Sequence, residues 1–119
     1  MTPFGEKIRS LRKARGINQK KMAADLGVSP AYLSALEHGH RGQPSWAMVQ
    51  KVIHYFYLIW DDAEEIETLA RLSDTRTTIN TAGLPPETVA FVNTLAAKVD
   101  QLSPQRVAEL IGLLDRDKD

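Results

Sequence analysis

The side chains best suited to chemistry in this sequence are basic and amide groups near its start, and the chemistry that they suit is the binding of phosphate. The 119-residue chain has no net charge, but residues 1–44 carry eight basic and three acidic groups, a net charge of +5. Residues 45–72 and 73–119 have net charges of −3 and −2. Contact with a phosphate backbone requires such a local excess of positive charge. The distribution favours a nucleic-acid partner, with a solvated basic face as the alternative.

Two short helices joined by a glycine turn are predicted for Asn18–Gly39, NQKKMAADLGVSPAYLSALEHG. Asn18 can cap the first helix by accepting a hydrogen bond from a free backbone amide. Gly27 tolerates the left-handed conformation that ends it. Ser29 and Pro30 then suit the cap and the first position of a second helix. The pattern indicates a helix-turn-helix and therefore double-stranded DNA as the partner, although an ordinary helical hairpin in a core would share these signals.

The segment resembles the Cro/CI-type, or XRE-type, helix-turn-helix of bacterial and phage regulators. The residues that match the family pattern are Gln19, Ala23, Gly27, Val28, Ser29, Leu33, Ser34, Leu36, Glu37 and Gly39, with Arg12 upstream and Pro44, Ser45 and Val52 downstream. The match covers roughly residues 4–60. It implies a five-helix, lambda-repressor-like domain whose second motif helix recognises DNA. We therefore expect a sequence-specific transcriptional regulator that acts as a repressor.

The resemblance also implies which residues face DNA. The predicted set is Gln19, Lys20, Ser29, Pro30, Ala31, Tyr32, Ser34, Ala35, His38, His40, Arg41 and Gln43. We expect phosphate contacts from Gln19, Lys20 and Arg41, although Gln19 could be a solvated surface amide. Positions 30, 31 and 35 carry proline and alanine where family members often have amide or basic groups, so only apolar contacts are available there. Specificity would then depend on Gln19, Ser34, the 38–43 loop or DNA shape.

An ion pair between Arg12 and Glu37 is a further implication of the resemblance. Arg12 falls on the predicted first helix and Glu37 at the end of the recognition helix. The pair would brace the recognition helix from behind, and removing one partner would leave a partly buried charge. The alternative is that Glu37 acts on the DNA face.

Helices are also predicted on both sides of the motif. A first helix covers about residues 2–13, a fourth opens at Ser45, and Asp61 with Glu64 resembles a capping box that starts a fifth. Most of the nearby aromatic side chains recur at helical spacing, so we expect a core role for most of them. These residues are Trp46, Tyr55, Phe56, Tyr57 and Trp60.

The last third of the chain has no such resemblance and is interpreted from its pattern alone. A polar, threonine-rich stretch predicts a linker with a short extended segment at Arg76–Thr81, and two amphipathic helices follow. We predict an all-α protein with a helix-turn-helix domain at 1–72, a linker at 73–84 and a C-terminal helical hairpin at 85–119.

The two C-terminal helices carry apolar stripes that a hairpin of this size cannot bury alone. The residues expected to form the stripes are Val89, Val92, Leu95, Ala96, Val99, Leu102, Val107, Leu110, Ile111 and Leu114. Pairing with a second copy would produce a homodimer and place two recognition helices under one two-fold axis. The alternative is that the hairpin folds back on the N-terminal domain.

Other classes of function find little support. The chain has no cysteine, no signal-peptide pattern and no apolar run that could span a bilayer, so we expect a cytoplasmic, nucleoid-associated protein. His38, His40 and His54 lack partners at metal-ligand spacing, and no catalytic or phosphate-loop motif is present. We expect no enzyme activity, cofactor, metal or small-molecule effector. The remaining alternative is an antitoxin-type interaction module that binds its own operator.

Overall fold

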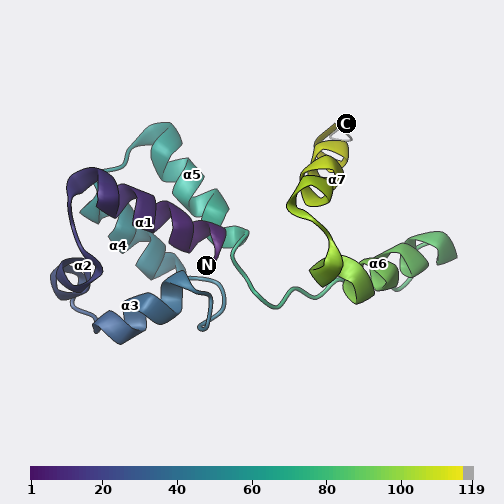
Figure 1. Cartoon of the computed structure of the whole chain (residues 1–119), viewed down its shortest axis with the longest axis horizontal. Helices are drawn as coiled ribbons and strands as arrows, with labels where there is room; N and C mark the ends of the chain where they lie inside the picture. The colour runs from purple at the N-terminus through teal and green to yellow at the C-terminus, as the bar shows by residue number, and fades with distance from the viewer. Residues whose placement is uncertain (117–119) are drawn as a thin grey trace. The chain divides into compact units, whose positions relative to one another are not determined.

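The computed structural model describes residues 1–116, and every regular element in this range is a helix (Figure 1). The chain divides into two compact units, Met1–Thr77 and a second from Thr78 onward. The predicted all-α architecture is confirmed.

Unit 1 contains five helices around one core. They are α1 (Pro3–Arg15), α2 (Gln19–Leu26), α3 (Pro30–Glu37), α4 (Trp46–Tyr55) and α5 (Trp60–Arg71). Helix α1 packs against α3 and α5, α2 packs against α3, and α4 packs against α5 (Figure 1). The fully buried side chains at the centre include Phe4, Ile8, Leu33, Val52 and Phe56. The core thus joins the helix-turn-helix to the helices that flank it.

Local capping explains why the first four helices begin where they do. Thr2, Asn18, Ser29 and Ser45 each accept a hydrogen bond from the backbone N–H three residues later, at 2.7–3.2 Å. These bonds satisfy amides that have no partner inside the helix. Gly27 ends α2 at φ 75°, the left-handed conformation that glycine adopts without a side-chain clash. All of these predicted helix ends are confirmed.

The predicted start of α5 is wrong. The helix begins at Trp60, and the preceding Ile59 makes no side-chain capping bond. Asp61 therefore lies inside the first turn, so Asp61 and Glu64 do not form a capping box. Asp61 and Asp62 instead place negative charge near the positive end of the helix dipole.

The expectation that most of the aromatic side chains are core is also wrong. Phe56 is fully buried and Tyr55 is partly buried, but Trp46, Tyr57 and Trp60 are 73%, 83% and 85% exposed. Trp46 is the first residue of α4, and the other two lie where the chain passes from α4 to α5. Helical spacing no longer determines which face a residue occupies at these ends.

The start of the predicted linker packs on unit 1. The Ser73 hydroxyl accepts a hydrogen bond from the Phe4 N–H at 2.9 Å and donates one to the Leu69 carbonyl at 2.6 Å. The Thr75 hydroxyl donates to the Gly39 carbonyl at 3.1 Å. Residues 76–81 form no strand. Their backbone has no neighbouring strand with which to form a ladder.

Unit 2 consists of α6 (Pro86–Lys98), a short 3₁₀ turn η1 (Val99–Gln101) and α7 (Pro104–Arg116). The Ser103 hydroxyl caps α7 by accepting a hydrogen bond from the Arg106 N–H at 3.1 Å. Helix α7 leaves the end of α6 steeply, so the two helices form an open hairpin (Figure 1). Neither helix has a buried residue. The final three residues of the predicted 85–119 element lie outside the described residues.

Candidate nucleic-acid interface

Helix α3 presents one face to the core and leaves the other open. Leu33 and Leu36 are buried, whereas Ser29, Pro30 and Ala31 are exposed. Three further residues of the predicted DNA-facing set, Tyr32, Ser34 and Ala35, are partly exposed. The first half of α3 is therefore accessible to a large partner, which is the geometry that a recognition helix needs in a DNA groove.

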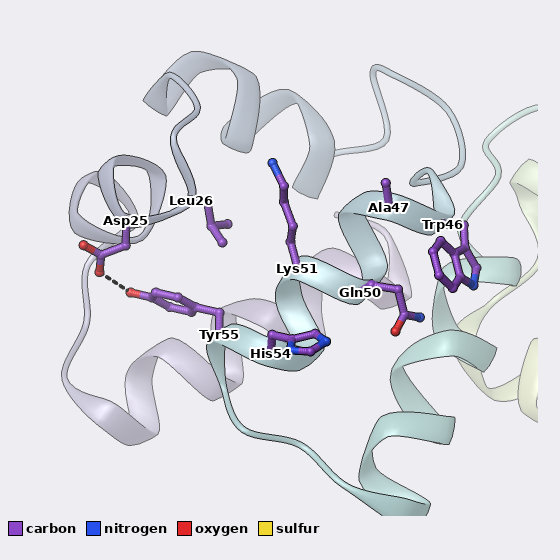
Figure 2. Close-up of a pocket in the computed structure, with 8 residues that line it drawn as sticks. All are labelled: Asp25, Leu26, Trp46, Ala47, Gln50, Lys51, His54 and Tyr55. Carbon is purple, nitrogen blue, oxygen red and sulfur yellow. Dashed lines mark hydrogen bonds between the residues drawn. The ribbon is translucent and has the colours of Figure 1, made fainter.

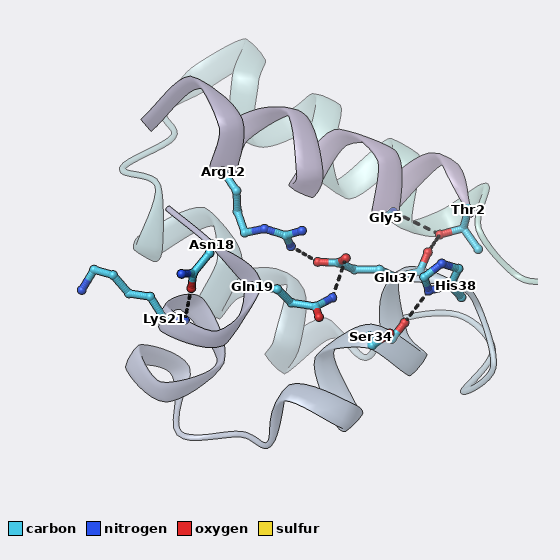
Figure 3. A network of polar contacts seen from close by, with 9 residues as sticks. All are labelled: Thr2, Gly5, Arg12, Asn18, Gln19, Lys21, Ser34, Glu37 and His38. Atoms are coloured by element: carbon cyan, nitrogen blue, oxygen red, sulfur yellow. Dashed lines mark hydrogen bonds and ion pairs between the residues drawn. The ribbon is translucent and has the colours of Figure 1, made fainter. Parts of the chain in front are cut away.

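A buried polar network holds α1, α2 and α3 together (Figure 3). The Arg12 guanidinium forms an ion pair with one carboxylate oxygen of Glu37, and the Gln19 side-chain amide donates to the other at 3.1 Å. The residue exposures of Glu37 and Arg12 are 0% and 7%. Both carboxylate oxygens are thus occupied inside the protein, and Gln19 is oriented by Glu37 at the first position of α2.

A close backbone approach between α1 and α3 completes this arrangement. The Glu37 carbonyl accepts hydrogen bonds from the Thr2 N–H at 3.1 Å and the Thr2 hydroxyl at 3.3 Å. A Cβ atom on Gly5 would lie 2.0 Å from the same oxygen. Sequence reasoning missed Gly5, although an isolated glycine inside a predicted helix is a signal for such an approach.

Two predicted phosphate contacts lie side by side at the start of α2. Gln19 is partly buried by its bond to Glu37, whereas Lys20 is exposed. Among residues 1–116, no ion pair joins Lys20 to an acidic side chain. Its charge is therefore available to a phosphate group.

The loop from α3 to α4 carries the remaining predicted contacts, His38, His40, Arg41 and Gln43. His40 and Arg41 are exposed. The His38 ring nitrogen Nδ1 lies 2.9 Å from the Ser34 carbonyl, and the rings of His38 and His40 stack with centroids 5.9 Å apart. The two histidine rings of the loop thus lie beside the end of α3.

A cavity of about 550 Å³ lies between the end of α2 and the outer face of α4 (Figure 2). Its lining residues are Asp25, Leu26, Trp46, Ala47, Gln50, Lys51, His54 and Tyr55. The Tyr55 hydroxyl donates to Asp25 at 2.7 Å. Burial and this bond raise the pKa of Tyr55 to about 12, and the same bond lowers the pKa of Asp25. No predicted DNA-facing residue lines the cavity.

Two other kinds of feature are absent from the part of the chain that the structure describes. No group of three or more His, Asp or Glu side chains among residues 1–116 could hold a metal ion. No helix in that range has the length and apolar character needed to cross a membrane.

The residues predicted for dimerisation lie on unit 2, and all of them are partly or fully exposed there. A groove of about 260 Å³ between α6 and α7 is lined by Phe91, Leu95, Leu110, Leu113 and Leu114. Leu113 also lines the groove, although it was not among the residues predicted for the stripes. The groove is an apolar surface that none of residues 78–116 covers.

Comparison with known proteins agrees with this geometry. Residues 8–56 match the family described as Helix-turn-helix. The chain is 40% identical over 52 residues to two proteins of Bacillus subtilis (strain 168), the uncharacterized HTH-type transcriptional regulator RghRB and the HTH-type transcriptional repressor RghR. The matched segment is 44% of this chain and 37% and 38% of those proteins, so the chain spans less than two-fifths of their length. No solved structure gives a significant match.

Residues 8–56, which include α2 and α3, are therefore similar to helix-turn-helix domains, and α2 and α3 correspond to the two helices of the motif.

Proposed function

We propose that this protein is a transcriptional regulator that binds double-stranded DNA as a homodimer and acts as a repressor. The observation that carries the proposal is the open face of α3, held by the Arg12–Glu37–Gln19 network and flanked by basic side chains. The name of one relative, a transcriptional repressor, supports the sign of regulation.

Binding should depend on salt, because basic residues of unit 1 would displace counterions from the phosphate backbone. Lys20→Ala should weaken binding to all duplex sequences alike and reduce the slope of log affinity against log salt by about one. Fluorescence anisotropy titrations over a range of salt concentrations measure this slope.

Lys98→Ala is the matched control, since Lys98 is an exposed lysine on α6 of unit 2. It should leave the slope unchanged. Equal slopes for wild type and Lys20→Ala would contradict the assignment of Lys20 to the phosphate contacts.

The exposed apolar faces of unit 2 support a second copy as the partner of α6 and α7. Neither helix buries a residue by itself, and the groove between them is lined by leucine and phenylalanine. Burial of such side chains stabilises association by about 1.5–3 kcal/mol for each one fully covered. Two copies would form a compact helical bundle and join two DNA-binding units.

Truncation after Thr77 should produce a folded monomer whose operator affinity is lower by about a hundredfold or more, because tethering of two binding units is lost. The cut is placed after Thr77 since Ser73 and Thr75 bond to unit 1, which has its own core. Sedimentation gives the oligomeric state, and titration with an operator duplex gives the affinity.

A point variant tests the same interface in the full chain. Leu110→Glu should also produce a monomer, whereas Gln105→Glu adds the same charge at an exposed polar position of α7 and should leave the dimer intact. A truncated chain that still sediments as a dimer at micromolar concentration would place the interface in unit 1 instead.

A further inference from the structure

The recognition helix has few side chains that could form hydrogen bonds to base edges. Its accessible positions include Pro30, Ala31 and Ala35, which have no polar side-chain atoms. The Ser29 hydroxyl accepts a hydrogen bond from the Tyr32 N–H at 3.0 Å and so is engaged as the helix cap. The hydroxyls of Tyr32 and Ser34 are the other polar groups on this face, and α3 carries no basic or amide side chain, so a donor from outside the helix would add strongly to its readout of bases.

Arg41 supplies such a donor at the correct end of α3. Its guanidinium carbon lies 4.9 Å from the centre of the Tyr32 ring, within the range of a cation–π contact. Tyr32 is the third residue of α3. Residues at the N-terminal end of a recognition helix are those that contact base edges in the major groove. The loop therefore places the Arg41 guanidinium beside the first half of α3, a helix that has no basic residue of its own.

The loop that carries Arg41 is itself anchored. Gly39 and Gly42 adopt positive φ values of 78° and 71°, and the Gly42 N–H donates to the Gly39 carbonyl at 3.1 Å. The Thr75 hydroxyl donates to that same carbonyl at 3.1 Å, and the His40 N–H donates to the Ala35 carbonyl at 2.9 Å. These bonds connect the loop to both α3 and the segment after α5, so the position of Arg41 is prepared before DNA binds.

The guanidinium is also free to form new hydrogen bonds. Among the residues that the structure describes, no ion pair joins Arg41 to an acidic side chain. An arginine that stacks on an aromatic ring can still direct its N–H donors outward in its own plane. This forked set of donors matches two neighbouring acceptors, and guanine presents such a pair, O6 and N7, in the major groove.

We propose that Arg41, held by Tyr32, is the main specificity-determining residue and that it forms a bidentate contact with one guanine in each half-site. This inference rests on the proposed function, and it replaces the phosphate contact that the sequence suggested for Arg41. Lys20 keeps the phosphate role, so the two basic residues differ in what they recognise.

Selection from a library of randomised duplexes with the full-length protein tests the proposal. Wild type should select sites with one guanine that is invariant in each half. Arg41→Lys keeps the charge but lacks the fork, so it should lower the preference for that guanine about tenfold or more, as expected for one lost bidentate pair. Tyr32→Ala should weaken the same preference, and Tyr32→Phe, which retains the ring, should preserve it. Lys20→Ala should select the same sites as wild type.

A modified duplex localises the contact to atoms. Replacing the selected guanine by 7-deazaguanine removes the N7 acceptor, which should weaken binding of wild type several-fold and leave Arg41→Ala unaffected, because alanine offers no donor to N7. Unchanged guanine preference in Arg41→Lys, or an equal loss of affinity for all sequences in Arg41→Ala, would overturn the inference and leave Arg41 as a phosphate contact. A wild-type protein that binds no duplex would overturn the proposed function itself.

Discussion

Glu37→Ala should lower the free energy of unfolding of unit 1 by about 3–5 kcal/mol, the cost expected when one partner of a buried ion pair is removed. The substitution leaves the Arg12 guanidinium buried without its carboxylate and removes the acceptor of the Gln19 amide. The melting temperature should fall by more than about 10 °C, given the size of the unit. Thermal and denaturant unfolding followed by circular dichroism measure both quantities. DNA binding should be lost as a consequence of unfolding.

A double-mutant cycle separates the ion pair from other effects of truncating Glu37. Arg12→Ala with Glu37→Ala should be less destabilising than the sum of the single changes, because neither residue then leaves an unpaired partner. Glu37→Ala protein with an unchanged melting temperature but no DNA binding would instead show that Glu37 acts on the DNA face.

Gly5→Ala should destabilise unit 1 by about 3 kcal/mol or more, because overpacking against an immovable neighbour adds to the loss of hydrogen bonds. The new methyl group would lie 2.0 Å from the Glu37 carbonyl oxygen, which belongs to the backbone and cannot rotate away. Helix α1 would have to move from α3, which would break the two hydrogen bonds from Thr2 and disturb the packing of Phe4. Chemical denaturation measures the change.

Gly112→Ala is the matched control for that prediction. Gly112 also lies inside a helix, α7, and a Cβ atom added there would meet no atom within 4 Å. Alanine also favours helix more than glycine does at such an open position. Because Gly112 belongs to unit 2, this variant should leave the free energy of unfolding of unit 1 unchanged. A Gly5→Ala protein as stable as wild type would show that the close approach of α1 and α3 is not required.

The sequence alone was sufficient to predict the helix-turn-helix and most of the helix ends. The caps at Asn18 and Ser29 and the turn at Gly27 depend on hydrogen bonds and backbone angles within three residues of each position. Such contacts are encoded locally, so residue type and spacing predict them well. The apolar periodicity of α6 and α7 likewise predicted two helices before any packing was known.

Predictions from residue type and spacing were wrong at the start of α4 and in the connection between α4 and α5. Ile59 rather than Asp61 precedes α5. Trp46 and Trp60 are exposed at the first positions of α4 and α5, and Tyr57 is exposed in the connection between these helices. The orientation of a side chain at such a junction depends on the path of the chain and on the neighbouring helices. Neither is visible in a short stretch of sequence.

The contacts that define the candidate DNA surface join residues far apart in the chain. Gln19 is oriented by Glu37, Arg41 is held over Tyr32, and Thr75 anchors the loop at Gly39. The residue types were known from the sequence, but each of these side chains had several plausible partners. For Gln19 the partner is set by the buried Glu37 carboxylate, since burial leaves a polar group little choice but the partner that the fold places beside it. For the exposed Arg41 and Thr75, the paths of the 38–43 loop and of the segment after α5 decide which group comes within reach.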